Sequence, residues 1–406
     1  MLYPMPVRQK ESIVAVYRIK TINTIAREGL ELLGKQFAVS ADESDPQGIL
    51  VRSSRVNTDE YSSLLAVARA GAGVNNISVT KATERGICVF NTPGANASAV
   101  VDLVFPMIGV WQRNIYRGIR FCESLMEIRG EEVSGEVERR KAAFRGVEIA
   151  GKTLAVIGLG QIGVRLANGG VHRYMRVKGF DPKPALANIH MLLPEVELTQ
   201  SLDEALSDAD IVSLHLPLME KTKDLVNADF IARMKKGTLL VNYARGPIVN
   251  EKDIIAALDS GQLSGYIADF PTKNLIGHEK ILLTPHLGAS TTESEENCAV
   301  MAAREIRNYL YYGNITNSVN FPNIETIPSD RVRTRLIVIN RDVPGMIAFI
   351  TKVLAAHDIN IDSFKNESNG TIGYNIIDME TGVADGIVNK IKHDENVIRT
   401  RIITFD

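Results

Sequence analysis

The residues with the clearest chemical meaning are three glycines that follow an apolar stretch in the middle of the chain. Residues 152–157 (Lys-Thr-Leu-Ala-Val-Ile) read as a strand and lead directly into Gly-Leu-Gly-Gln-Ile-Gly at 158–163. In G-x-G-x-x-G the first glycine permits a tight turn, the second lets the backbone approach a pyrophosphate, and the third lets the next helix pack against its strand. The N–H groups at the helix start then bind phosphate. We expect dinucleotide contacts from Gly158, Gly160, Gln161, Ile162 and Gly163.

One carboxylate indicates which dinucleotide this site binds. Asp181 ends a second strand-like run, 18 residues after Gly163. A carboxylate at this position accepts hydrogen bonds from the adenosine ribose hydroxyls and repels a 2′-phosphate. Glycine-rich turns also recur by chance, but the preceding strand and this acid favour a cofactor site. The sequence therefore predicts NAD rather than NADP.

Composition and charge limit the other classes of function. A chain of 406 residues with 45% hydrophobic and 23% charged residues is typical of two to three globular domains. Its net charge of −2 offers no general attraction for nucleic acid or an anionic membrane. The three cysteines are widely spaced and predict neither a disulfide framework nor a metal site. With no signal segment and no apolar run long enough to span a bilayer, we expect a cytoplasmic protein.

Strand-like runs alternate with helical patterns over the first three quarters of the chain, which is typical of parallel sheets wound with helices. We expect one sheet before residue 95 and a second after residue 150. Residues 99–120 and 293–312 read as long helices, and the second could return to the first domain and make it discontinuous. Strands are expected at 13–17, 48–53, 65–70 and 87–91, and later at 152–157, 178–181, 209–215, 238–242, 264–269 and 281–285.

The pattern changes near Arg333. Strand-like and helical runs from there to residue 405 follow the order βαββαβ, with strands expected at 335–340, 359–365, 372–379 and 397–405 and the first helix at 343–357. This part has no G-x-G-x-x-G, so it is not a second nucleotide site. Residues 317–330 contain two prolines, show little periodicity and look like a linker.

Six motifs together carry a family resemblance. They are residues 70–77, 89–94, the glycine motif with Asp181, 213–217, 241–246 and 283–291. On these motifs the chain resembles the D-2-hydroxyacid dehydrogenases, and among them the D-3-phosphoglycerate dehydrogenases of the short form with a C-terminal ACT domain. The resemblance implies an α/β fold with two doubly wound parallel-sheet domains, a flavodoxin-like substrate lobe and a Rossmann NAD lobe, plus a βαββαβ ACT domain. It implies a substrate-binding domain at 1–97 with 288–316, an NAD-binding domain at 98–287, a linker at 317–330 and an ACT regulatory domain at 331–406.

The resemblance also implies a reaction, the NAD-dependent oxidation of 3-phosphoglycerate to 3-phosphohydroxypyruvate, the first step of serine biosynthesis. Hydride transfer from C2 needs a base for the hydroxyl proton and a cation for the carboxylate. His286 follows a predicted strand and can act as the general acid/base. Arg245 also follows a strand and can bind the carboxylate through two N–H groups. Alone they could be a capping histidine and a surface arginine, but the surrounding motifs favour the catalytic roles.

One part of the family pattern is missing between these two residues. Relatives carry a glutamate there that pairs with the histidine and stabilises the imidazolium. Aligned without gaps, Lys273 takes the place of this glutamate and Ala268 that of an aspartate. Asp269 is the nearest carboxylate that could substitute, although it could equally contact the nicotinamide amide or be structural. If no acid reaches His286, we expect a displaced pH optimum.

A phosphorylated substrate needs further donors. Arg52-Ser53-Ser54-Arg55 follows the second predicted strand and can supply them, although it could also be a solvated loop. The resemblance implies substrate contacts from Arg52, Ser53, Ala72, Gly73 and Asn75. It implies further cofactor contacts from Pro217, Thr222, Tyr243, Ala244, Arg245, Asp269 and Gly288.

Two turns of the C-terminal part could face one small polar ligand. ACT domains of related dehydrogenases bind L-serine at such turns, typically between two subunits, which implies an effector site at Asn340, Asp342 and Asn360 and a homodimer or homotetramer. A dimerisation module without a ligand is the alternative. Two other functions stay open, namely another 2-hydroxyacid dehydrogenase such as a hydroxypyruvate/glyoxylate reductase, and a noncatalytic NAD-sensing regulatory protein. The retention of His286 and Arg245 weighs against the last.

Overall fold

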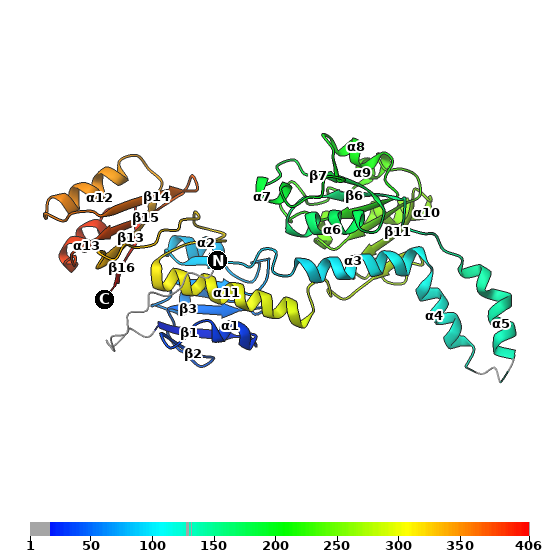
Figure 1. The fold of residues 1–406 in the computed structure, drawn as a ribbon, viewed down its shortest axis with the longest axis horizontal. Coiled ribbons are helices and arrows are strands. Elements are labelled where there is room, and N and C mark those ends of the chain that lie inside the picture. The colour runs from blue at the N-terminus through cyan, green and yellow to red at the C-terminus, as the bar shows by residue number, and fades with distance from the viewer. Residues whose placement is uncertain (1–16, 127–129, 131, 406) are drawn as a thin grey trace. The chain divides into compact units, whose positions relative to one another are not determined.

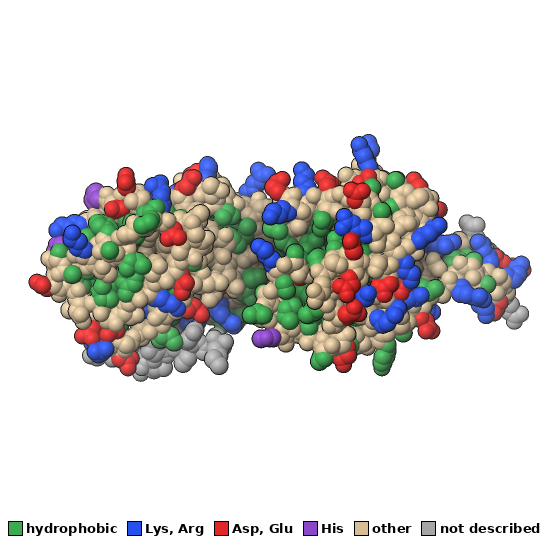
Figure 2. Space-filling model, turned by 90° about the horizontal axis from the view of Figure 1, so that it is seen from above, with side chains coloured by type: hydrophobic (Ala, Val, Ile, Leu, Met, Phe, Trp, Pro, Cys, Tyr) green, Lys and Arg blue, Asp and Glu red, His purple; other side chains and the backbone are tan. Residues whose placement is uncertain are grey.

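The computed structural model describes residues 17–126, 130 and 132–405, so the strand expected at 13–17 lies outside the described residues except for Tyr17. The chain forms two compact units, Met1–Ala95 with Glu295–Asp406, and Asn96–Ser294. Within the described ranges, every helix is too short or too polar to cross a membrane. Basic and acidic side chains are interspersed over much of the face seen in Figure 2.

A five-stranded parallel sheet forms the N-terminal part of the first unit. Its strand order, β2-β1-β3-β4-β5, is the flavodoxin-like order. The inner strands β3 and β4 are apolar on both faces, because one face packs on α1 and α11 and the other on α2. The elements are β1 Tyr17–Ile22, α1 Arg27–Glu31, β2 Phe37–Ser40, β3 Gly48–Val51, η1 Thr58–Glu60, β4 Ala66–Arg69, α2 Val79–Glu84, β5 Cys88–Phe90 and, far along the chain, α11 Thr292–Tyr312.

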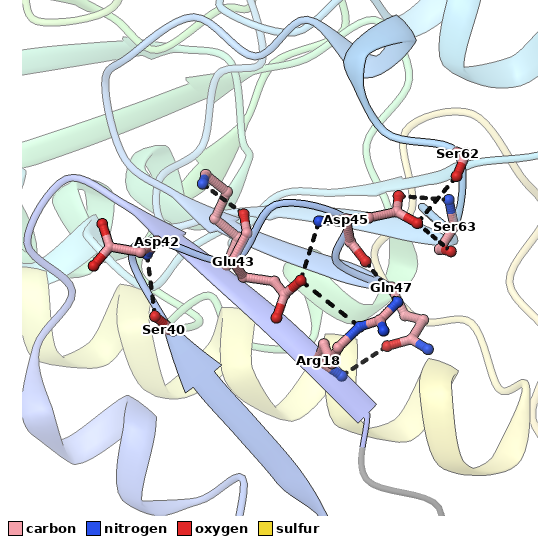
Figure 3. A network of polar contacts seen from close by, with 9 residues as sticks. Arg18, Ser40, Asp42, Glu43, Asp45, Gln47, Ser62 and Ser63 are labelled. Carbon is pink, nitrogen blue, oxygen red and sulfur yellow. Dashed lines mark hydrogen bonds and ion pairs between the residues drawn. The ribbon is translucent and has the colours of Figure 1, made fainter.

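A polar network fixes the connection between β2 and β3 (Figure 3). The Asp45 carboxylate accepts hydrogen bonds from the Ser63 hydroxyl (2.6 Å), the Ser63 N–H (2.9 Å) and the Ser62 hydroxyl (3.0 Å), which lower its pKa to about 2. Gln47 Oε1 accepts from the N–H of Arg18 (2.7 Å) and joins this segment to β1. These residues lie at or before the starts of their strands, opposite the carboxyl edge where parallel sheets bind ligands. The network therefore supports the fold.

The C-terminal part of the first unit has the predicted βαββαβ order and forms an antiparallel sheet, β14-β15-β13-β16. One face of this sheet packs on α12 and α13. The other face belongs to the apolar cluster that also contains α11 and the five-stranded sheet. The elements are β13 Thr334–Arg341, α12 Met346–Ala355, β14 Ser363–Ser368, β15 Ile372–Met379, α13 Asp385–Lys392 and β16 Val397–Thr404.

Two arginines, the buried Arg335 and the half-buried Arg401, join the antiparallel sheet to the end of α11. Arg335 is fully buried, makes a two-pronged ion pair with Asp378 (2.7 and 2.8 Å) and donates to the carbonyl of Tyr312 (2.7 Å). Arg401 donates to the carbonyl of Tyr309 (2.9 Å). Cations at the C-terminus of a helix satisfy its last carbonyls and complement its dipole. The sheet and the helix are therefore packed as one body.

The segment expected as a linker, residues 317–330, packs on the five-stranded sheet. The side chain of Asn320 accepts from the N–H of Val89 and donates to the carbonyl of Ile87, both at 2.9 Å. Phe321 and Ile324 are buried in the cluster around α11. The segment thus contributes to the core of the first unit.

The second unit is built on a seven-stranded parallel sheet of order β12-β11-β10-β9-β6-β7-β8, the Rossmann order with one further strand. Helices α3 (Ala97–Gln112) and α6 cover one face and α8, α9 and α10 cover the other (Figure 1). The two parallel sheets confirm the predicted α/β class. The elements are β6 Thr153–Ile157, α6 Gln161–Val171, β7 Arg176–Phe180, α7 Leu186–Ile189, β8 Glu197–Leu198, α8 Leu202–Leu206, β9 Ile211–Leu214, α9 Ala228–Ala232, β10 Thr238–Asn242, η3 Gly246–Ile248, α10 Glu251–Asp259, β11 Leu263–Ala268 and β12 Ile281–Leu283.

The prediction of a single helix at 99–120 is wrong. The structure has α3 at Ala97–Gln112 and α4 at Ile115–Ser124, separated by Asn114 with a left-handed φ of 51°. Asparagine is one of the few residues that tolerate this conformation. The chain then returns through α5 (Glu132–Arg140) and η2 (Lys141–Phe144), and Phe144 stacks on Phe121 with ring centroids 5.1 Å apart. The helix expected at 293–312 is confirmed as α11.

Candidate active site

The glycine motif forms the turn between β6 and α6. Gly158 has a φ of +96°, and a Cβ there would lie 2.5 Å from the carbonyl oxygen of His215. A Cβ at Gly163 would overlap the carbonyl oxygen of Gly158. At Gly160 a Cβ would have no described atom within 4 Å. The first and third glycines are therefore required by packing, and the second borders open space.

The glycine turn lies at the topological switch point of the seven-stranded sheet, because the strand order reverses between β6 and β9. Open parallel sheets bind ligands at this point, outside the carboxyl ends of the strands. The loop after β9 carries Pro217 and Thr222. The Thr222 hydroxyl donates to the carbonyl of Pro217 (2.6 Å) and accepts from the N–H of Met219 (2.8 Å), so these two predicted cofactor residues belong to one ordered turn.

Asp181 follows β7 and contacts the glycine turn directly. Its carboxylate accepts from the N–H of Leu159 (2.9 Å) and the N–H of Lys183 (2.8 Å). Gln161 donates to the side chain of Asn188 (2.7 Å), which in turn donates to the carbonyl of Leu159 (3.1 Å). The prediction missed Asn188, because the short helix α7 that carries it has no recognisable sequence signal.

Residues after β10 present Arg245. Asn242, fully buried at the end of β10, accepts from the N–H of Ala244 (3.1 Å) and donates to the carbonyl of Arg245 (3.0 Å). Tyr243 and Ala244 are buried, whereas Arg245 is exposed and one of its N–H groups donates to the carbonyl of Ala244 (2.6 Å). The turn therefore holds the backbone and directs a cationic side chain outward.

Asp269, at the end of β11, fixes the loop that carries His286. Its carboxylate is 2% exposed and accepts from the N–H groups of Leu287 (2.8 Å) and Gly288 (2.7 Å) and from the Thr284 hydroxyl (2.5 Å). Its carbonyl accepts from the N–H of His286 (3.0 Å). In the part of the chain that the structure describes, no hydrogen bond joins this carboxylate to the His286 imidazole. The geometry supports a positioning role for Asp269 over that of proton partner.

His286 is exposed at the end of β12 and has a left-handed φ of +57°. Such conformations cost about 1 kcal/mol or more for residues other than glycine and cluster at functional sites. Its ring meets Phe270 edge-on, with centroids 5.2 Å apart.

Burial raises the pKa of Tyr243 to about 12, so its hydroxyl stays protonated beside the Thr284 hydroxyl (3.3 Å). Lys273 is exposed.

The predicted substrate residues lie at the carboxyl edge of the five-stranded sheet. Arg52 and Ser53 follow β3, which neighbours β1 at the switch point of this sheet. Asn23, after β1, has a φ of +70° and accepts from the N–H groups of Ser53 (3.1 Å) and Ser54 (3.0 Å). The prediction missed Asn23, although an asparagine directly after a strand is a recognisable turn signal. Arg52 forms an ion pair with Glu295 (2.6 Å).

The loop after β4 is tied to the same edge. Arg69 donates to the carbonyls of Arg52 (2.9 Å) and Gly73 (2.6 Å), and Asn91 donates to that of Ala72 (2.6 Å). Asn75 is exposed at the end of this loop. Arg69 thus joins the loop of Arg52 and Ser53 to the loop of Ala72 and Gly73.

A cavity of about 460 Å³ lies at the end of β13, and Asn340 and Asp342 line it. Asn340 is buried and accepts from the side chain of Asn375 (2.7 Å). The Asp342 carboxylate accepts from the Ser368 hydroxyl (2.5 Å). Asn360 is exposed and is not among the residues that line the cavity. Asn366, from β14, lines it instead and was missed, because strand pairing rather than sequence spacing brings it there.

Comparison with known proteins identifies the family. Residues 117–288 match the model of the D-isomer specific 2-hydroxyacid dehydrogenase, NAD binding domain. The D-3-phosphoglycerate dehydrogenase of Haemophilus influenzae is 32% identical over 84% of this chain and 81% of its own length. That of Bacillus subtilis is also 32% identical, and the match covers 73% of this chain and 56% of the relative. The solved structure of NAD+-bound 3-phosphoglycerate dehydrogenase from Entamoeba histolytica shares the fold, with a TM-score of 0.60, 24% identity, and coverage of 75% of this chain and 99% of that one.

The chain therefore belongs to the D-isomer specific 2-hydroxyacid dehydrogenase family. Both relatives named above are D-3-phosphoglycerate dehydrogenases. The match to the NAD-binding domain confirms the cofactor that Asp181 and the glycine motif predict.

Proposed function

We propose that this protein catalyses the NAD-dependent oxidation of 3-phosphoglycerate to 3-phosphohydroxypyruvate, which is the first step of serine biosynthesis. One observation supports the proposal: the residues to which we assign cofactor binding and catalysis follow the carboxyl ends of six strands of one sheet. They are the glycine turn after β6, Asp181 after β7, Pro217 after β9, Arg245 after β10, Asp269 after β11 and His286 after β12. The relatives support the choice of substrate.

The roles of these residues follow from their chemistry. His286 takes the proton of the C2 hydroxyl, and the Arg245 guanidinium holds the neighbouring carboxylate. Bound NAD supplies the hydride acceptor. Asp269 holds the His286 loop through Leu287 and Gly288. We assign the backbone of Tyr243, Ala244 and Gly288 to the nicotinamide end of the cofactor and Pro217 and Thr222 to the adenine end.

The phosphorylated end of the substrate needs a separate anion site. We assign it to Arg52 and Ser53, with the backbone of Ala72 and Gly73 and the side chain of Asn75. The support is the shared sheet edge, the hydrogen bonds that join the loops after β1, β3 and β4, and the guanidinium of Arg52, which can bind a phosphate through two N–H groups.

We further propose that residues 331–406 are an ACT regulatory domain, with residues 1–97 and 288–316 binding substrate and 98–287 binding NAD. The support is the βαββαβ order and the cavity at Asn340 and Asp342, which we assign to L-serine. Asn360 does not line this cavity, so its contact would come from a second subunit of a homodimer or homotetramer. The proposed pathway supports a cytoplasmic location.

The test is an initial-rate assay of NADH formation from 3-phosphoglycerate and NAD, repeated with L-serine present. We expect activity in the wild type and its loss in His286→Ala with NAD binding intact. Activity on hydroxypyruvate or glyoxylate alone would identify a different 2-hydroxyacid dehydrogenase. NAD binding without turnover of any of these compounds would indicate a noncatalytic NAD-binding protein.

A further inference from the structure

We infer that Glu295 competes with the phosphate of the substrate for Arg52 and thereby restricts this anion site to strong acceptors. The inference rests on the proposed function, because it takes Arg52 as the phosphate-binding residue. Its starting point is the ion pair in which Arg52 Nη2 lies 2.6 Å from Glu295 Oε1.

The main chain that follows the Cα of Arg52 is held in place by three hydrogen bonds. Its carbonyl accepts from Arg69 Nε (2.9 Å). The next two N–H groups, those of Ser53 and Ser54, donate to Asn23 Oδ1. This loop is fixed to the ends of β1 and β4. The guanidinium is therefore the part of Arg52 that can exchange one anionic partner for another.

Glu295 is held independently, in the first turn of α11. An acidic side chain in the first turn of a helix is favoured by the helix dipole. The helix is anchored one turn later, where the backbone of Ala299 approaches Gly29 of α1 so closely that a Cβ at Gly29 would lie 2.5 Å from the Ala299 carbonyl carbon. The carboxylate is thus presented to Arg52 from a fixed element.

The ion pair is weak enough to be displaced. The side chains of Arg52 and Glu295 are 39% and 44% exposed, and pairs this exposed are screened by water. A phosphate dianion accepts two parallel N–H bonds from one guanidinium and is the stronger partner. A ligand carboxylate that displaces Glu295 exchanges one carboxylate for another and gains little. Glu295 therefore admits phosphate to Arg52 and disfavours ligands that carry only carboxylates.

Glu295→Gln removes the competing charge and keeps the size of the side chain. We expect KM for 3-phosphoglycerate to fall by up to about fivefold, the upper end for an exposed ion pair, with kcat within about twofold of wild type. Inorganic phosphate should become a better competitive inhibitor by the same factor. D-glycerate, which lacks the phosphate, should show no change in KM.

Two further variants make the result specific. Glu293→Gln removes the same charge from the same helix at an exposed position outside this ion pair, and we expect it to behave as wild type. In an Arg52→Gln background the Glu295→Gln change should have no further effect, because the two side chains act as a pair.

An increased KM and a weaker phosphate inhibition in Glu295→Gln would overturn the inference, because Glu295 would then orient Arg52 for the substrate. Unchanged constants, or an equal effect in Glu293→Gln, would overturn it as well. If the wild type does not oxidise 3-phosphoglycerate, the proposed function fails. Calorimetric titration of wild type and Glu295→Gln with inorganic phosphate still tests the competition in that case.

Discussion

Replacing Asp269 with asparagine separates two possible roles of this carboxylate, the positioning of the His286 loop and the binding of its proton. The carboxylate is 2% exposed and accepts three hydrogen bonds, from Thr284, Leu287 and Gly288. Asparagine has one oxygen, so its NH₂ group would face at least one of these donors. A hydrogen bond to a charged group contributes about 1.5–3 kcal/mol, so we expect the loop to lose about 2 kcal/mol.

We expect this loss to lower kcat/KM by up to about 30-fold, because 1.36 kcal/mol corresponds to a factor of ten in rate. The pH at which the rate changes should stay the same, since the carboxylate has no hydrogen bond to the imidazole among the described contacts. The assay is kcat/KM from pH 6 to 10 for the wild type and Asp269→Asn, with Thr284→Val as a control that removes one donor and leaves the charge. A displacement of the profile by about one pH unit or more would refute the reasoning, because it would show a direct charge pair with the histidine.

Three other predictions concern the cofactor, the core and pH. Asp181→Ala should raise the ratio of NADP to NAD activity, measured as kcat/KM with each cofactor, and an unchanged ratio would contradict the assignment of the ribose site. Asp378→Asn leaves the buried guanidinium of Arg335 without its countercharge and should lower the free energy of unfolding by about 3–5 kcal/mol in denaturant titrations, whereas a loss below 1 kcal/mol would be inconsistent with that ion pair. Burial raises the pKa of Glu305 to about 8, above its value in the unfolded chain, so its stabilising contribution is complete below pH 4.5 and is lost as the pH rises towards 8. Between pH 4.5 and 8 the wild type should therefore lose stability on the order of 4 kcal/mol, and Glu305→Gln should not show this loss. An identical pH dependence of stability in both proteins would refute this.

The cofactor site could be predicted because its constraints are local in sequence. The turn at Gly158 and the close approach at Gly163 need glycine whatever the rest of the chain does, and Asp181 follows the next strand. The alternation of strands and helices predicted both parallel sheets for the same reason, since a run of apolar residues indicates a buried strand without knowledge of its neighbours.

Residues that depend on distant partners were not predictable in this way. Glu295 and Arg52 form an ion pair although they are 243 residues apart in the sequence, and no sequence pattern near either residue indicates this contact. Asp269 was noticed as an acid, but its three donors become visible only once the loop after β12 is in place. The break at Asn114 was missed because apolar residues continue on both sides of it, whereas the cause is a single left-handed residue.

In the proposed reaction, hydride passes from C2 of 3-phosphoglycerate to the nicotinamide at this site. The direct measurement is a single-turnover reaction of the enzyme with NAD and 3-phosphoglycerate that carries deuterium at C2, followed by mass spectrometry of the reduced cofactor. We predict that one deuterium is transferred to the reduced nicotinamide, and that His286→Ala abolishes the transfer. Reduced cofactor without deuterium, or no reduced cofactor from the wild type, would contradict the account.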